Sequence, residues 1–312
     1  MRKTYKVKKN RKYKTNRSNK IFHKTIRRGR NKVLSGGSLI GQGNFGCVFR
    51  PELTSKLSLT HNGNIVSKVV LKNNAFSEYR HEFKILKKMR DIDPKGLFHS
   101  LLVDAYELEN KHVPDDFQKC SLTKPTYDIN EFFVFNIAFS GNHNLTYYLK
   151  NVFNIRKDSK IIPEPSVLFS LIANIIVGIK KMIDGNILHK TLNTDSVFLI
   201  EPISLENPYS AKIIDYGDGE LRKYRGFSDK NQDYITFFKG IIKMLSLVFR
   251  NEQHDKSHDN VIQNLIKGFT ELLSMVEKNN VSYNEVIKSY ILLLQNTFGK
   301  KDAEYAKTHY KA

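Results

Sequence analysis

The sequence predicts an α+β protein in which a small β-rich lobe precedes a larger α-helical lobe. Short β-branched and apolar segments dominate up to residue 138, a turn cluster follows at 139–142, and long apolar helical patterns dominate after it. The 312 residues are enough for one two-lobed fold or about two compact units. We therefore expect three parts, which are a basic tail over 1–34, a first lobe over 35–140 and a second lobe over 141–312.

The composition narrows the class of protein. A hydrophobic fraction of 40% and a charged fraction of 26% are typical of globular chains and exclude a fibrous or wholly disordered one. No segment approaches the roughly 18–20 uninterrupted apolar residues of a membrane span, so we expect no transmembrane segment. Cys47 and Cys120 are too few for a disulfide scaffold or a Cys-only zinc site, and a reducing, intracellular compartment is the simpler expectation.

The net charge of +20 is concentrated at the N-terminus. Of the 51 Lys and Arg residues, 15 lie in residues 1–33 without any Asp or Glu, which leaves 36 basic against 31 acidic residues in the rest. Such a block repels itself and has little apolar surface to bury, so we expect it to be disordered. Contact with nucleic acid, an anionic surface or an acidic partner is one interpretation, and a solubilising tail is an equal alternative.

The first predicted strands flank a glycine-rich turn. Gly41, Gly43 and Gly46 belong to a G-x-G-x-F-G-x-V stretch, and the residues after Gly46 are β-like until Pro51. A strand–turn–strand of this kind lets backbone amides approach phosphate groups that a Cβ would exclude. On this segment alone, an ordinary Gly-rich hairpin is the alternative.

The next two predicted elements each carry one candidate charge. Lys68 lies within a strand expected over 64–70, and Glu82 lies on a helix expected over 77–89. A strand Lys suits nucleotide phosphates, and a Glu on the following helix suits that Lys as a partner. Glu78 is the rival carboxylate, and a solvent-facing lysine is the alternative for Lys68.

The remaining elements follow from the apolar patterns. We predict, in order, strands over 98–106 and 131–138, a short helix over 144–149, a long apolar helix over 166–183 that ends at 184–186, and a further apolar helix opened by Asp233 and Tyr234.

Two later motifs make a family resemblance specific. Residues 189–196 (HKTLNTDS) resemble the catalytic loop H-R-D-L-K-x-x-N of protein kinases, and residues 215–217 (DYG) resemble their metal-binding D-F-G segment. With the Gly-rich turn, Lys68 and Glu82 in the same order, they make residues 36–250 similar to the protein-kinase superfamily. The Gly-rich wording, the Lys/Asn-rich composition and residues 92–94 look like the kinase-like proteins of large double-stranded DNA viruses, which implies host cytoplasm or virion.

The resemblance implies a bilobal protein-kinase-like fold that binds ATP and Mg²⁺. The implied nucleotide-binding residues are Gly41, Gly43, Gly46, Val48, Val66, Lys68, Glu82 and Phe198, and the implied metal ligands are Asp215 and Ser196. Val66 and Phe198 are bulkier than the family's usual residues, so they either tighten the adenine pocket or fill it. Leu86, Tyr216 and His189 would form an internal spine, for which plain core packing is a sufficient explanation.

The departures from the family concern the catalytic loop. Thr191 stands where the family has its catalytic Asp, and an uncharged hydroxyl does not serve as a general base at neutral pH. Asn193 replaces a phosphoryl-neutralising Lys, and Ser196 replaces the Asn that holds a second metal ion. Asp195 is the only nearby carboxylate, in a place that usually faces away. Only 17 residues separate Asp215 from Asp233, without an A-P-E-like triplet.

These features lead to three hypotheses. The first is a pseudokinase that binds ATP and acts as a scaffold or regulator of a protein partner not identifiable from sequence. The second is a divergent, active Ser/Thr kinase, because phosphoryl transfer depends largely on positioning and electrostatics. The third is a protein that binds nucleic acid or an acidic partner through its basic tail.

Overall fold

The computed structural model describes residues 37–43, 46–53, 64–72, 79–110, 113, 115–123, 127–154, 162–201, 209–221, 227–251, 254–278 and 281–301. The chain divides into two units, Met1–Ser35 and Gly36–Ala312, and every described residue belongs to the second. The basic segment 1–33 and the rival carboxylate Glu78 therefore lie outside the described residues.

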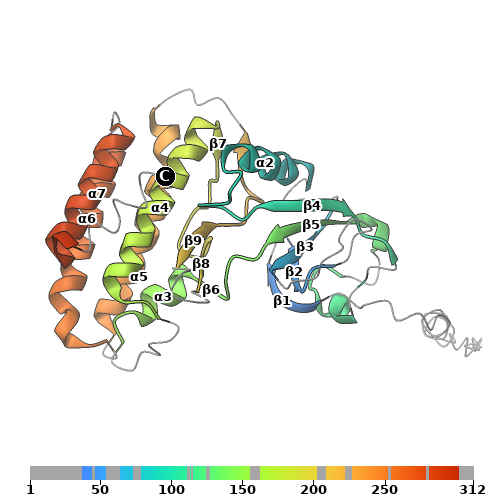
Figure 1. Cartoon of the computed structure of the whole chain (residues 1–312), viewed down its shortest axis with the longest axis horizontal. Coiled ribbons are helices and arrows are strands. Elements are labelled where there is room, and N and C mark those ends of the chain that lie inside the picture. The colour runs from blue at the N-terminus through green and yellow to red at the C-terminus, as the bar shows by residue number, and fades with distance from the viewer. Residues whose placement is uncertain are drawn as a thin grey trace, which may run out of the picture. The chain divides into compact units, whose positions relative to one another are not determined.

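The first part of the described unit is a five-stranded antiparallel sheet with the strand order β1-β2-β3-β5-β4 (Figure 1). Its strands are β1 (Ser38–Gly43), β2 (Gly46–Arg50), β3 (Ile65–Leu71), β4 (Leu102–Glu107) and β5 (Phe132–Ala138). β-Branched and aromatic residues fill β3 and β5, which is the composition expected of strands buried on both faces.

Each face of this sheet has its own apolar cover. Helix α2 (Tyr79–Ile92) covers one face, where Phe83 stacks on Phe135 with ring centroids 6.2 Å apart. The other face packs against the long connection between β4 and β5, which contains the short helices η2 (Asp115–Lys119) and η3 (Ile129–Glu131). The sequence pattern predicted no element within this connection, yet it supplies Leu108, Phe117 and Cys120 to a second core.

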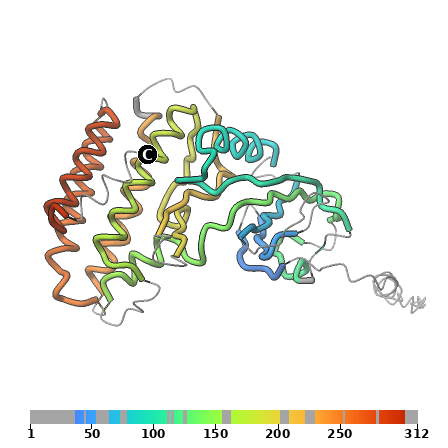
Figure 2. The backbone as a smooth tube through the Cα atoms, viewed as in Figure 1, coloured from blue at the N-terminus to red at the C-terminus, as the bar shows by residue number. Residues whose placement is uncertain are grey.

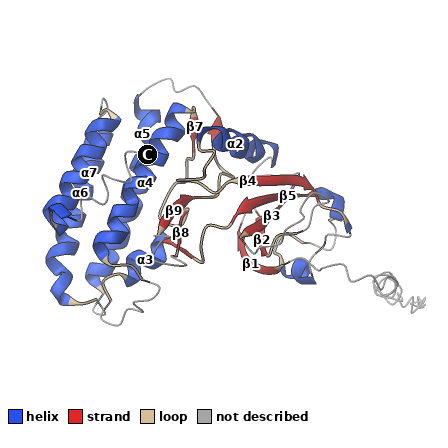
Figure 3. Ribbon diagram, in the orientation of Figure 1, coloured by secondary structure: helices blue, strands red, loops and turns tan. Residues whose placement is uncertain are grey.

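The second part is mainly helical, and Figure 3 shows the change from strands to helices along the chain. Its elements are β6 (His143–Asn144), α3 (Leu145–Asn151), α4 (Pro165–Asp184), β7 (Ile187–Leu188), β8 (Val197–Ile200), β9 (Ser210–Ile213), β10 (Glu220–Leu221), α5 (Phe227–Arg250), η4 (Lys256–His258), α6 (Asp259–Glu277) and α7 (Tyr283–Phe298). Helices α4–α7 contact one another around one large apolar core. The backbone tube in Figure 2 shows the chain passing from β5 into this part.

Helix α4 is apolar on nearly every side because it lies at the centre of that core. Among the described helices it alone has the length and composition of a membrane span, and 61% of that window is buried inside the folded unit. A core helix passes the same test of length and composition.

The coarse expectation of an α+β chain, strand-rich first and helical afterwards, is confirmed. One helix boundary was wrong, because α5 begins at Phe227 and Asp233 lies in its second turn rather than opening it. Phe227 is the one apolar residue before Tyr234 in this helix, so no apolar periodicity reveals where the helix begins. The carboxylate of Asp233 accepts hydrogen bonds from another segment instead of capping its own helix.

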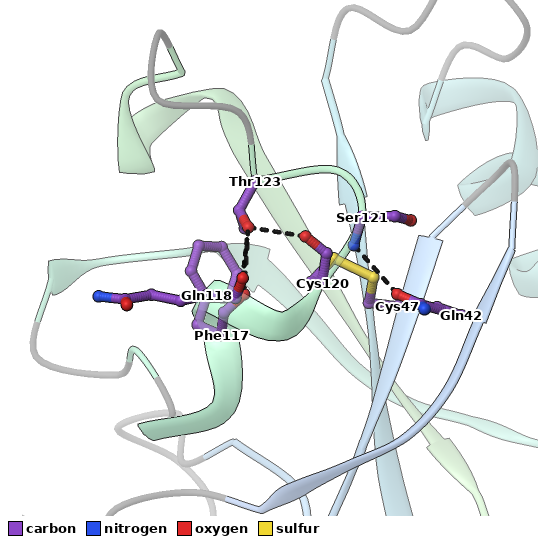
Figure 4. The surroundings of a disulfide bond; sticks show 7 residues. All are labelled: Gln42, Cys47, Phe117, Gln118, Cys120, Ser121 and Thr123. Carbon is purple, nitrogen blue, oxygen red and sulfur yellow. Dashed lines mark hydrogen bonds between the residues drawn. A yellow bond between two sulfur atoms is a disulfide. The ribbon is translucent and has the colours of Figure 1, made fainter.

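The two cysteines, which the sequence analysis left unpaired, meet in the structure. Cys47 on β2 and Cys120 after η2 form a disulfide, with Cα atoms 5.9 Å apart (Figure 4). A disulfide is typical of oxidising surroundings, whereas the cysteine count favoured a reducing compartment, and the compartment stays a prediction. The sequence separation of 73 between the two cysteines explains why nothing local in the sequence signals the pairing.

Candidate functional site

Lys68 is the centre of the candidate site. Its Nζ lies 2.6 Å from Oε1 of Glu82 on α2 and 2.9 Å from Oδ1 of Asp215, which follows β9. The side chains of Lys68 and Glu82 are almost fully buried, whereas that of Asp215 is 45% exposed. One ammonium group therefore joins the sheet, the helix that covers it and the segment that follows β9.

The strand register explains why Lys68 faces this way. Val48 on β2 and Phe135 on β5 pair directly with Lys68 from either side, so the three side chains share one face of the sheet. That face is the one covered by α2, and Cys47 and Val69 point to the opposite face. A register shift of one residue would send Lys68 into the second core.

Burial and neighbouring charges oppose each other in the titration of these three groups. Burial disfavours the charged form of Lys68, but the carboxylates of Asp215 and Glu82 outweigh it and raise the pKa of the ammonium. Lys68 lowers the pKa of Asp215 against a smaller opposing effect of burial. Burial raises the pKa of Glu82, with Lys68 acting in the opposite direction. At neutral pH, Lys68 therefore carries its charge and the exposed Asp215 is ionised.

The glycines of the β1–β2 hairpin fall into two groups. A Cβ on Gly46 would come within 2.7 Å of the carbonyl oxygen of Val69, so the packing of the sheet itself requires glycine there. Gly41 and Gly43 have ordinary φ values, and among the described residues a Cβ would meet nothing closer than 4.0 Å at Gly41 and nothing within 4 Å at Gly43. Neither the backbone nor the packing of the described chain accounts for glycine at these two positions.

Three apolar residues of the expected nucleotide site belong to neither core. Val48 and Phe198 are partly exposed, and Val66 is buried. All three are absent from both apolar clusters of the described residues, and Phe198 pairs across strands with Asn144 and Lys212. Val66 lies two residues before Lys68 on β3 and shares its face of the sheet, whereas Phe198 lies on β8 in the second part of the chain.

The loop 189–196 is fixed by a buried carboxylate. Asp233 on α5 accepts hydrogen bonds from the backbone N–H groups of His189 at 2.9 Å and Lys190 at 3.0 Å. Lys190 has a left-handed φ of 69° and forms an ion pair with Glu220 on β10. Asp215 also has a positive φ, 65°, and such strained residues concentrate at functional sites.

The three residues that depart from the kinase pattern are accounted for locally. Asn193 Oδ1 accepts hydrogen bonds from the backbone N–H groups of Asp195 and Ser196, so its side chain closes a turn. Ser196 is buried and its hydroxyl donates to the carbonyl of Thr191 at 3.3 Å. Thr191 is exposed, and Asp195 accepts a hydrogen bond from Asn144 at 2.9 Å. The sequence analysis did not anticipate Asn144, whose amide side chain gives no distinguishing signal.

The donor set limits what metal the site accommodates. Ile214 donates a backbone hydrogen bond to the Ser196 carbonyl, which puts Ser196 beside the segment that carries Asp215. Among the described residues, no group of three His, Cys, Asp or Glu side chains is arranged to hold a metal ion. One exposed carboxylate suits a Mg²⁺ ion that takes its other ligands from water and phosphate.

Internal packing connects the loop to the sheet. The rings of His189 and Tyr216 lie 5.1 Å apart, and both residues and Leu86 are buried. The Nε2 of His189 contacts the carbonyl of Ile214 at 2.9 Å. These contacts hold Ile214 and Tyr216, the two neighbours of Asp215, and so fix the position of its backbone.

Comparison with known proteins adds no relationship. Neither a protein-family model nor a curated protein sequence matches this chain.

Proposed function

We propose that this chain is a kinase-like nucleotide-binding protein, with ATP as the ligand, that has lost phosphoryl transfer. The observation that carries the proposal is the bridge from Lys68 to both Glu82 and Asp215. A buried lysine held by a helix carboxylate, next to an exposed carboxylate, provides a cation for phosphate oxygens and an anion for Mg²⁺.

The glycine geometry supports the same proposal. Gly41 and Gly43 lack a structural reason to be glycine among the described residues. Close approach of a ligand's phosphate groups to the backbone is a physical reason for glycine at such positions. Val48, Val66 and Phe198 are the apolar residues outside both cores that would line the base-binding part.

The loss of transfer rests on the loop 189–196. The exposed Thr191 supplies a hydroxyl where a carboxylate base is needed. The side-chain oxygen of Asn193 accepts a backbone hydrogen bond that closes a turn. Asp215 and Ser196 would hold at most one Mg²⁺ ion, which would neutralise phosphate charge. The resulting function is nucleotide-dependent scaffolding or regulation rather than catalysis.

A thermal-shift titration tests the proposal. ATP with Mg²⁺ should stabilise the full chain by RT ln(1 + [L]/Kd), about 2.7 kcal/mol at a hundredfold excess over Kd. Lys68→Met should weaken ATP binding by roughly tenfold or more, because a charge-assisted hydrogen bond to phosphate is lost. Asp215→Asn should remove the part of the shift that depends on Mg²⁺.

The matched control is Lys72→Met. Lys72 lies one residue beyond the end of the same strand and pairs with Glu107 at 3.0 Å, away from Glu82 and Asp215. This variant should keep the full nucleotide shift. Because Lys68→Met leaves a buried carboxylate unpaired, its own stability is measured first, and Asp215→Asn carries the test if it does not fold. The absence of any shift at millimolar ATP would contradict the proposal.

A further inference from the structure

The connection between β4 and β5 is bonded to the Gly-rich hairpin on the face of the sheet opposite Lys68. Cys120 at the end of η2 is bonded to Cys47, which directly follows Gly46 on β2. Ser121 donates a backbone hydrogen bond to Oε1 of Gln42 at 3.0 Å. Gln42 and Cys47 are direct partners across the hairpin, so both strands are held at the same rung (Figure 4).

The same connection stays attached without the disulfide. Phe117 packs between Phe49 and Phe132, with ring centroids 6.2 and 5.1 Å away. Thr123 donates its hydroxyl to the carbonyl of Cys120 at 2.7 Å, which closes the turn that presents the cysteine. Breaking the disulfide therefore removes one constraint on the hairpin and leaves the apolar core beneath it.

We propose that the Cys47–Cys120 disulfide is a redox-responsive clamp that immobilises the Gly-rich hairpin, and that reduction releases the hairpin locally. The consequence for nucleotide affinity rests on the proposed function. A hairpin held in place loses less conformational freedom when a ligand orders it, so the oxidised chain binds nucleotide more tightly.

The redox step is an ordinary thiol–disulfide exchange with a dithiol reductant. A thiolate of the dithiol attacks Sγ of Cys120, forms a mixed disulfide and releases the Cys47 thiolate. The second thiol of the reductant then displaces Cys120, so two electrons and two protons pass to the cysteines and the dithiol becomes a disulfide. Cys47 is fully buried and Cys120 is 3% exposed, whereas their neighbours Lys119 and Ser121 are exposed. Attack thus requires the turn at 120–123 to open first.

Hydrogen exchange on the full chain, before and after dithiothreitol, tests the clamp independently of nucleotide. Exchange over residues 38–50 should quicken by at least about tenfold on reduction, whereas exchange over β5 (132–138) should change much less. Reoxidation should restore the slow exchange. In the double variant Cys47→Ser with Cys120→Ser, exchange at the hairpin should be fast and should not change on addition of dithiothreitol. If this variant does not fold, the reversible change in the wild-type protein is the test.

Binding of ATP is measured on the same two redox states. Reduction should weaken it by about threefold to tenfold. Redox-dependent exchange without nucleotide binding in either state upholds the clamp and overturns the proposed function. Equal exchange at 38–50 in both states, or an equal change throughout the sheet, overturns the clamp while leaving the proposed function standing. Free thiols in the native, air-oxidised protein would also overturn it.

Discussion

At the scale of single residues, the chemistry depends on how a few side chains are used locally. Lys68 is shared by two carboxylates of different exposure, so one of them, Asp215, remains open to solvent and to a ligand. In the loop 189–196, by contrast, Asn193 and Ser196 are engaged in hydrogen bonds that stabilise the loop itself. The site combines a buried charge centre with a loop in which residue 191 is a threonine.

This contrast leads to a prediction about phosphoryl transfer. The unmodified protein should transfer no measurable phosphate to generic Ser/Thr peptides, and Thr191→Asp alone should not make it a good kinase. Groups that act as a unit are far from additive, and Asn193 and Ser196 would still lack their family roles. The triple variant Thr191→Asp, Asn193→Lys and Ser196→Asn should reach at most slow autophosphorylation, measured with labelled ATP.

The control for this experiment is Asp215→Ala in the triple-variant background, which should abolish the autophosphorylation. Transfer by the unmodified protein at about 1 s⁻¹, as in active kinases, would rule out the pseudokinase interpretation. Asp195 would then be the first carboxylate to replace, because it is exposed in the same loop.

At the scale of elements, the connection between β4 and β5 buries the second face of the sheet. Without it, the apolar face that includes Phe49, Val69 and Val134 would be open to water. With it, both faces are buried, and the strands that carry the candidate site sit between two cores. The packing of the sheet therefore depends on a segment that covers the face opposite Lys68.

The contribution of this second core to the free energy of unfolding can be measured by replacing Phe117. Phe117→Ala should lower the free energy of unfolding by about 3 kcal/mol, because a buried ring in contact with Phe49 and Phe132 is replaced by a cavity. The matched control is Gln118→Ala, the exposed neighbour on the same short helix, which should change it by less than about 0.5 kcal/mol. Denaturant unfolding checks both values, and equal effects would refute the second core.

At the scale of the whole unit, residues 93–100 tie the sheet to the helical part. Asp93, at the end of α2, accepts backbone hydrogen bonds from Leu97 at 2.8 Å and Phe98 at 2.9 Å, and its carboxylate contacts the ring of His99 at 2.8 Å. Phe98 and Ile213 on β9 are joined by a backbone hydrogen bond of 2.8 Å. A buried carboxylate thus shapes the turn that connects α2 to the strand preceding Asp215.

The titration of Asp93 makes this connection sensitive to acid. Burial opposes ionisation of Asp93, but the hydrogen bonds from His99 and from the backbone outweigh it and lower its pKa below the usual 3.8. A carboxylate with a lowered pKa stabilises the fold above its unfolded pKa and loses that contribution as the pH falls through the folded pKa. The expected loss therefore begins near pH 4 and continues below it.

Asp93→Asn should accordingly lower the free energy of unfolding by about 1–3 kcal/mol at neutral pH, because an amide is a poorer acceptor for these buried donors. The difference between wild type and variant should shrink as the pH falls from 5 toward 2, followed by denaturant unfolding at each pH. A difference that stays constant over that range would show that the charge of Asp93 is not the cause. The exposed Asp91→Asn serves as the control and should leave the curve unchanged.

The sequence by itself determined the order of strands and helices and the identity of the candidate charges. Hydrophobic periodicity and turn residues are local signals, so β3, α4 and the helix that carries Glu82 follow from neighbouring residues alone. The same signals miss the start of α5, where Phe227 is the one apolar residue before Tyr234.

Only the tertiary structure decided which distant groups meet. Lys68 and Asp215 lie 147 residues apart, and the two cysteines lie 73 apart, so their contacts depend on strand register and on the packing of separate elements. The β4–β5 connection has no periodicity of its own, and its apolar residues acquire a role only against the sheet. Long-range contacts of this kind depend on the whole fold, because each requires the rest of the chain to bring its two halves together.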